Sequence, residues 1–178
     1  MIKIMEQMGF PSKWLCWIKS LFGSARSSVL LNGTPGRKFY CKRGVRQGDP
    51  LSPLLFVIAA DLLQAAINLE FRQGNLLAPI PAEGQDYPVV QYANDTIAVL
   101  PADLAQIVKM KSILREYAES VGLHINFAKS TLVPINLAED RAAHLAQALG
   151  CSLGKMPFTY LGLPMGTTRP TVSDFMRW

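Results

Sequence analysis

An apolar segment that begins after residue 50 constrains the fold more than any other part of this sequence. Asp49 can accept hydrogen bonds from the free N–H groups of a helix start, and Pro50 suits a first helical position because it has no N–H to satisfy. The helix expected after them is apolar around much of its circumference: Leu54, Leu55, Ile58, Leu62 and Ile67. Such a helix must be deeply packed. With 178 residues, 49% hydrophobic and 17% charged, the chain can supply the core, and one domain is favoured over a disordered chain.

Nothing in the sequence predicts a membrane or secreted protein. The longest apolar run, Leu54 to Ala60, lies between a proline and Asp61 and is far shorter than the ~18 residues of a membrane span. Residues 1–6 contain no long apolar region, so we expect no secretory signal. The cysteines are odd in number and scattered, which fits neither a disulfide framework nor a zinc site: Cys16, Cys41 and Cys151. We therefore expect an intracellular protein, nuclear or cytoplasmic, without a membrane partner.

Capping signals and hydrophobic periodicity predict a mixed order of helices and hairpins, hence an α+β fold. Ser12 caps a helix that Gly23 closes, and Asp103 caps a longer amphipathic helix that Gly122 ends. A hairpin is expected around Asn32-Gly33, and a tighter one around Asn94-Asp95. The remaining predictions are strands at 29–31, 38–41, 88–93 and 96–100, a loop at 74–86, a strand-like segment at 123–134, a helix at 137–149 and a last strand at 158–163.

The charge is concentrated at one end of the chain. Residues 1–50 contain nine Lys or Arg and two acids, whereas residues 51–178 contain nine bases and eleven acids. Five of the early bases fall within ten residues: Arg37, Lys38, Lys42, Arg43 and Arg46. This asymmetry indicates an anionic partner, nucleic acid first, although a solvated basic surface explains the charge equally well.

Two segments could carry chemistry. In the turn before the apolar helix, Gly44 and Gly48 allow close backbone approach, Arg43 and Arg46 favour anions, and Gln47 can donate to or accept from a base or sugar. The second segment is the hairpin at residues 92–95, where a carboxylate could hold Mg²⁺. Taken singly, each is also explained as a capped helix or a polar hairpin tip. His124 and His144 are isolated and are expected to be structural.

Taken together, these segments resemble reverse transcriptases of non-LTR (LINE-type) retrotransposons, particularly those of plants. Residues 43–56 read Arg-Gly-Val-Arg-Gln-Gly-Asp-Pro-Leu-Ser-Pro-Leu-Leu-Phe and resemble the B motif of that family. Residues 92–96 read Tyr-Ala-Asn-Asp-Thr where the family has Tyr-Ala-Asp-Asp-Thr. Residues 122–130, Gly-Leu-His-Ile-Asn-Phe-Ala-Lys-Ser, and residues 160–164, Tyr-Leu-Gly-Leu-Pro, are similar to later elements of the family.

The resemblance implies a polymerase palm, an antiparallel sheet with a catalytic-type hairpin packed on helices, which would copy an RNA template from a DNA primer with two Mg²⁺ ions. Residues 1–166 would form this partial domain, and residues 167–178 would begin a following region. Carried over, Asp95 is a catalytic and metal-binding aspartate with Asn94 as its degenerate partner, and Lys129 acts near the pyrophosphate, unless it is an ordinary surface lysine. Nucleotide and template contacts fall on Arg43, Arg46, Gln47, Gly48 and Tyr92, and primer contacts on Tyr160 and Gly162.

Two departures from the family predict an inactive chain. Asn94 replaces the first aspartate of the hairpin, and residues 1–8 contain no aspartate to match the upstream metal ligand. Of three expected carboxylates only Asp95 remains, so Mg²⁺ should not bind productively. An upstream polypeptide is a candidate partner that would complete the palm. The alternatives are a non-catalytic nucleic-acid-binding module, which retains the basic segment, and a degenerate transposon relic.

Overall fold

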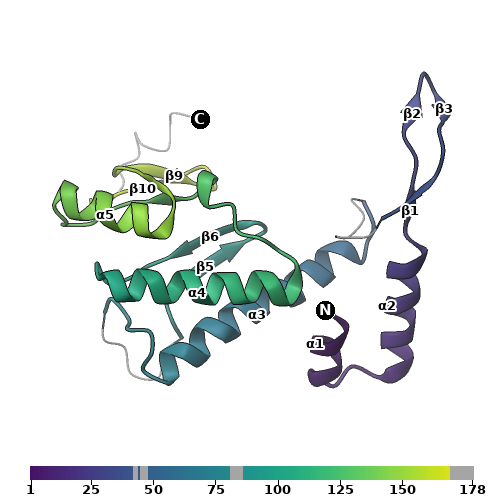
Figure 1. The fold of residues 1–178 in the computed structure, drawn as a ribbon, viewed down its shortest axis with the longest axis horizontal. Helices are drawn as coiled ribbons and strands as arrows, with labels where there is room; N and C mark the ends of the chain where they lie inside the picture. Colours follow the sequence, from purple (N-terminus) through teal and green to yellow (C-terminus); the bar gives the residue numbers. More distant parts are fainter. Residues whose placement is uncertain (42–43, 45–47, 81–85, 169–178) are drawn as a thin grey trace.

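The computed structural model describes residues 1–41, 44, 48–80 and 86–168, and within them helices alternate with short strands (Figure 1). The helices are α1 (Ile2–Gln7), α2 (Ser12–Ser24), α3 (Ser52–Arg72), α4 (Leu104–Val121) and α5 (Glu139–Leu149), with a 3₁₀ turn, η1 (Phe127–Lys129). The strands are β1 (Arg26–Ser27), β2 (Leu30–Leu31), β3 (Thr34–Pro35), β4 (Phe39–Tyr40), β5 (Val89–Tyr92), β6 (Asp95–Ala98), β7 (Thr131–Leu132), β8 (Ser152–Leu153), β9 (Phe158–Tyr160) and β10 (Leu163–Met165). Mixed helices and small sheets agree with the expected α+β class.

The strands pair only two by two in the described part of the chain. Four pairs are antiparallel, β1–β4, β2–β3, β5–β6 and β9–β10, whereas β7 and β8 run parallel. The resemblance implied an incomplete, palm-like antiparallel sheet. Most of the described strands do pair antiparallel, but they are mostly two or three residues long and no pair joins another.

Helix α3 begins later than its sequence signal predicted. Asp49 does accept a hydrogen bond, from the backbone N–H of Leu51 at 3.0 Å, but this bond closes a turn that precedes the helix. The helix starts at Ser52, and Pro53 occupies its first turn, where the missing N–H is no loss. The helix thus begins two residues after Pro50, the first helical position that the sequence predicted.

Helix α3 packs into both apolar clusters of the molecule. Its first half contributes Leu55 to a cluster with Met5, Leu15 and Ile18. Its second half contributes two residues to a larger cluster, which comprises Leu63, Ile67, Leu76, Tyr87, Met110, Ile113 and Tyr117. The helix is therefore packed along one face and not, as predicted, around much of its circumference, because Leu54, Val57 and Leu69 are exposed.

The apolar stretch is also longer than expected. Within the described residues, α3 is the one helix that is long and apolar enough, by length and composition, to cross a membrane, with a mean hydropathy of 1.7. Core helices of soluble proteins have the same properties. The run from Leu54 to Ala60 is thus part of a longer helix, which Asp61 does not interrupt.

Helix α4 matches its prediction closely. Asp103 Oδ1 accepts from the N–H of Gln106 at 3.1 Å, and Gly122 ends the helix in the left-handed conformation. At the start of α2, by contrast, Ser12 is the first helical residue and makes no cap, since the capping position is Pro11. Helix α4 contacts α3 on one side and α5 on the other.

Two predicted strands differ from the structure. Residues 123–126 alternate between half-buried and exposed, as a strand would, but the segment then turns into η1, and pairing begins only at β7. The predicted strand at 158–163 is a hairpin, in which Leu161 and Gly162 form the turn between β9 and β10, both with positive φ. A leucine at such a position gives no turn signal, and this is why the hairpin was missed.

Residues 26–40 form a ribbon that projects away from the helices (Figure 1). Asn32 and Gly33, with φ of 47° and 80°, make the expected tight turn between β2 and β3. The predicted partner of residues 29–31 was residues 38–41, but β4 pairs with β1 instead. The tip of the ribbon is apolar and exposed, with Leu30 and Leu31 exposed by 65% and 70%.

Candidate functional site

The β5–β6 hairpin carries the candidate site. Tyr92 and Asp95 form the last pair of its ladder, so the two-residue turn is Ala93-Asn94. The sequence predicted Asn94-Asp95 as the turn, with the carboxylate at its apex. In the structure Asp95 belongs to β6 instead, and its side chain lies on the same face of the hairpin as that of Tyr92. Both residues are exposed.

In the offset turn Ala93 adopts the left-handed backbone conformation, with φ of 48°. Asparagine and aspartate tolerate positive φ better than alanine does, so the sequence favoured the neighbouring pair. The offset places the neutral amide of Asn94 in the turn and the carboxylate of Asp95 on the strand.

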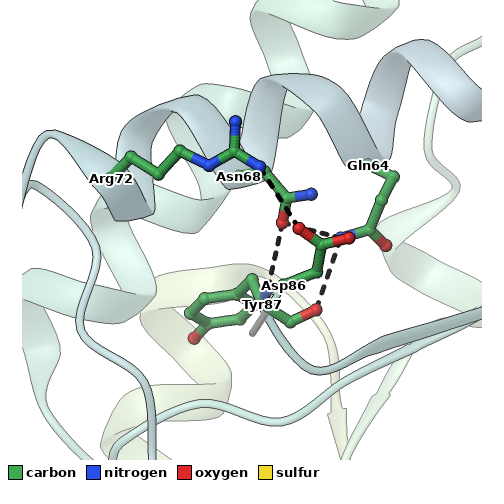
Figure 2. Close-up of polar contacts among 5 residues, drawn as sticks. All are labelled: Gln64, Asn68, Arg72, Asp86 and Tyr87. Atoms are coloured by element: carbon green, nitrogen blue, oxygen red, sulfur yellow. Dashed lines mark hydrogen bonds and ion pairs between the residues drawn. The ribbon is translucent and has the colours of Figure 1, made fainter. Parts of the chain in front are cut away.

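Two amide side chains of α3 hold the start of the hairpin (Figure 2). Asn68 Oδ1 accepts from the backbone N–H of Tyr87 at 2.9 Å, and Gln64 Nε2 donates to Asn68 Oδ1 at 3.0 Å and to the carbonyl of Tyr87 at 3.3 Å. Asn68 is buried. We call Gln64, Asn68 and Tyr87 the amide clasp. It satisfies both backbone groups of a buried residue two positions before β5 and so fixes where the hairpin leaves the core.

The side chain of Tyr87 anchors the same point. It is 2% exposed, stacks edge-on against Phe71 and donates from its hydroxyl to the carbonyl of Leu77 at 3.3 Å. Burial raises the pKa of Tyr87 to about 12, because the phenolate would lose its hydration. A second buried amide, Gln106, accepts from the N–H of Leu77 at 2.7 Å.

Sequence reasoning missed the amide clasp and Gln106. The signal was present in α3, where Gln64 and Asn68 lie four residues apart and therefore share one face of an otherwise apolar helix. Polar side chains on a buried face need partners, and a search for such pairs would have found them. Outside the clasp, Gln91 on β5 has a buried Nε2 atom without a hydrogen-bond partner in the described structure.

The other predicted site residues do not gather around Asp95 through any hydrogen bond or ion pair of the described chain. Arg43, Arg46 and Gln47 lie outside the described residues. Gly48 is described, with φ of 82° in the turn before α3. Lys129 is exposed at the end of η1, where Asn126 Oδ1 accepts from its N–H at 3.2 Å.

The two primer-contact candidates are neighbours on the β9–β10 hairpin. Gly162 lies in its turn with φ of 81°. The hydroxyl of Tyr160 is buried and has no hydrogen-bond partner within the described structure.

The donor set at the β5–β6 hairpin does not fit a two-magnesium centre. Such a centre needs several oxygen ligands that converge on the ions. The hairpin supplies one carboxylate, Asp95, beside the neutral amide of Asn94. Among the described residues no group of three or more His, Cys, Asp or Glu could hold a metal ion.

Comparison with known proteins gives consistent matches. The sequence model of a family described as "Reverse transcriptase (RNA-dependent DNA polymerase)" matches residues 1–165. A "Retrovirus-related Pol polyprotein from type-1 retrotransposable element R2" of Popillia japonica is 24% identical over 188 residues, which cover 99% of this chain and 30% of that protein. The type-2 element R2DM protein of Drosophila melanogaster is 27% identical over 133 residues, 74% of this chain and 12% of its own length.

A third relative, "Transposon TX1 uncharacterized 149 kDa protein" of Xenopus laevis, is 26% identical over 133 residues, 74% of this chain and 10% of that protein. The chain thus spans less than a third of the length of each of these three relatives.

Proposed function

Because this chain belongs to the reverse transcriptase (RNA-dependent DNA polymerase) family, we propose that it is the palm portion of a non-LTR retrotransposon polymerase and that it does not extend a primer by itself. The resemblance noted in the sequence is confirmed at the level of the family, with retrotransposon Pol proteins among the relatives. The palm assignment, the boundary at residue 166, the RNA template and the DNA primer belong to this proposal.

The donor set of the β5–β6 hairpin carries the proposal of inactivity. In a two-metal polymerase, carboxylates offset the charge of both divalent ions and hold them about 3.5–4 Å apart. Asp95 is exposed and stands opposite Tyr92, while Asn94 brings an oxygen donor without negative charge. One carboxylate on a two-stranded support cannot organise two such ions. We assign no chemical step to a metal in this chain.

Primer extension tests this proposal directly. The purified chain is incubated with a DNA primer annealed to an RNA template, the four deoxynucleotides, and Mg²⁺ or Mn²⁺. We expect no extension, and we expect none from Asn94→Asp, because a second hairpin carboxylate still leaves the set incomplete. The positive control is a reverse transcriptase with a full carboxylate set, which should extend the same primer and so show that the template can be copied.

The Asp95→Asn variant is the matched control for contamination. Extension that persists in this variant comes from another enzyme in the preparation. Template-dependent extension by the chain that Asp95→Asn abolishes would overturn the proposal of inactivity and would identify Asp95 as catalytic.

A second candidate function is nucleic-acid binding without catalysis, and the charge distribution favours it. The described residues 1–41 contain six Lys or Arg and one acid. Phosphate contacts release counterions, so binding of this kind weakens steeply as salt rises. Titration of labelled RNA and DNA at two salt concentrations tests it. Binding that is absent at low salt, or that does not respond to salt, would contradict it.

A further inference from the structure

The whole net charge of the chain lies in its first 41 residues. This segment has six bases and one acid, whereas residues 42–178 contain twelve of each sign, and the total is +5. Within the described part of the chain, none of the six bases forms an ion pair with a carboxylate, and all are exposed: Lys3, Lys13, Lys19, Arg26, Arg37 and Lys38. An unpaired, exposed cluster of one sign attracts a ligand of the opposite sign.

Two of these cations lie against exposed aromatic rings. Lys13 Nζ is 5.3 Å from the ring centroid of Trp17, and Arg26 Cζ is 4.5 Å from that of Tyr40, whose hydroxyl also accepts from the guanidinium. Trp17 and Tyr40 are each 57% exposed. An exposed ring offers a π-face on which any nucleobase can stack, and the neighbouring cation can reach the phosphate.

The two pairs lie on one continuous stretch of structure. Lys13 and Trp17 are one turn apart on α2, which ends at Ser24, and Arg26 follows directly in β1, in register with Tyr40. Trp17 and Ser24 are seven positions apart on the helix, a rise of about 10 Å. The Trp17 ring also packs edge-on against Trp14, with 6.3 Å between the ring centroids. We call the four residues Lys13, Trp17, Arg26 and Tyr40 the cation–aromatic surface.

We propose that the cation–aromatic surface binds single-stranded nucleic acid, with bases stacked on Trp17 and Tyr40 and phosphates contacted by Lys13 and Arg26. Single strands are favoured over duplexes because stacking on a side chain needs an unpaired base. RNA and DNA single strands share this chemistry. The inference deepens the second candidate function and needs neither a metal nor the β5–β6 hairpin, so its failure would leave the proposal about primer extension untouched.

Fluorescence anisotropy with labelled oligo(U) and oligo(dT) tests the proposal on the full chain. We expect Trp17→Ala and Tyr40→Ala each to weaken binding by about fivefold or more, and Trp17→Phe and Tyr40→Phe to retain most of it, since a ring is kept. The double variant Lys13→Gln, Arg26→Gln should reduce the slope of log affinity against log salt by about 1.4, because each lost phosphate contact removes about 0.7.

The matched charge control is the double variant Arg115→Gln, Lys155→Gln, which removes two exposed bases elsewhere. It should change affinity far less than the Lys13, Arg26 pair does. Circular dichroism confirms that every variant is folded, which the exposure of the four side chains predicts. A difference between oligo(U) and oligo(dT) identifies the preferred strand.

Three results would overturn the proposal. Equal losses in the two double variants would mean that net charge alone drives binding. Tighter binding to a duplex of the same length would exclude stacking on unpaired bases. Binding to vesicles that contain phosphatidylserine, with none to oligonucleotides, would assign this surface to a membrane, which the exposed Leu30 and Leu31 at the ribbon tip would then enter.

Discussion

Ala93 has a backbone conformation that residues other than glycine, asparagine and aspartate rarely adopt, and it lies directly before Asn94 and Asp95. A left-handed alanine costs about 1–2 kcal/mol. Backbone strain of this kind persists only where the surrounding structure enforces it, and here the ladder from Val89–Ala98 to Tyr92–Asp95 does so. The turn is therefore set by pairing in the strands and not by the preference of its own residues.

Replacing Ala93 with glycine should stabilise the chain. Glycine adopts positive φ without strain but loses more backbone entropy on folding, so we expect a net gain of about 0.5–1 kcal/mol. The midpoint of urea unfolding measures it. Ala65→Gly, at an exposed position inside α3, is the matched control and should lose about 1 kcal/mol. A loss in both variants would show that Ala93 is not strained.

Tyr87 should make the chain sensitive to alkaline pH. Burial raises the pKa of Tyr87 to about 12 in the folded protein, whereas an unburied tyrosine has a pKa of 10.0. As pH rises, the unfolded chain therefore releases the proton first. The contribution of Tyr87 is complete below pH 10 and is lost as pH rises from 10 toward 12, by roughly 2–3 kcal/mol. Urea unfolding at several pH values measures this loss.

The Tyr87→Phe variant separates this effect from other groups. It loses the hydrogen bond to Leu77 and some stability at neutral pH, but its stability should fall less between pH 10 and 12. Some dependence of stability on pH should remain in this variant because burial also raises the pKa of Tyr117. Identical pH profiles for the two proteins would contradict the assignment to Tyr87.

At the scale of elements, the amide clasp joins α3 to the candidate site. Asn68→Leu keeps the volume but removes the acceptor, which leaves the buried N–H of Tyr87 without a partner and removes one of the two hydrogen bonds that Gln64 Nε2 donates. We expect a loss of about 1–3 kcal/mol in urea unfolding. Arg72→Ala breaks the neighbouring 3.4 Å ion pair with Asp86, both side chains being largely exposed, and should cost less than about 1 kcal/mol. Comparable losses would contradict a special role for the clasp.

The helices could be predicted from the sequence far better than the strands. Asp103 and Gly122 define α4 because a cap acts on its own neighbours in sequence. The turn between β5 and β6, by contrast, follows the pairing of the two strands from Val89–Ala98 to Tyr92–Asp95, which the turn preferences of Asn94 and Asp95 do not contain. The hairpin itself was predicted from the sequence, but its turn was predicted one position too late for this reason. Predictions on Arg43, Arg46 and Gln47 stay untested.

At the scale of the whole molecule, the chain exposes an unusually large surface. Its accessible area is 13023 Å² at 19.6 kDa, whereas a compact monomer of that mass exposes about 8,600 Å². Apolar side chains contribute to this surface, among them Leu30 and Leu31 on the ribbon and Val90 and Tyr92 on the β5–β6 hairpin, all more than half exposed. Two-stranded sheets also leave strand edges open to pairing.

This surface predicts that the isolated chain self-associates. The ribbon near its tip exposes two leucines, Leu30 and Leu31 on β2, by 65% and 70%. Each leucine that becomes buried between copies would stabilise association by about 1.5–3 kcal/mol. Sedimentation velocity over a range of concentrations should show oligomers. The double variant Leu30→Thr, Leu31→Thr should shift the distribution toward monomer. Threonine is chosen because it preserves strand propensity. Leu69→Thr, which removes one exposed leucine from α3, is the control and should change the distribution less. A wild-type chain that stays monomeric and melts in one sharp transition would instead show that the exposed surface needs no cover.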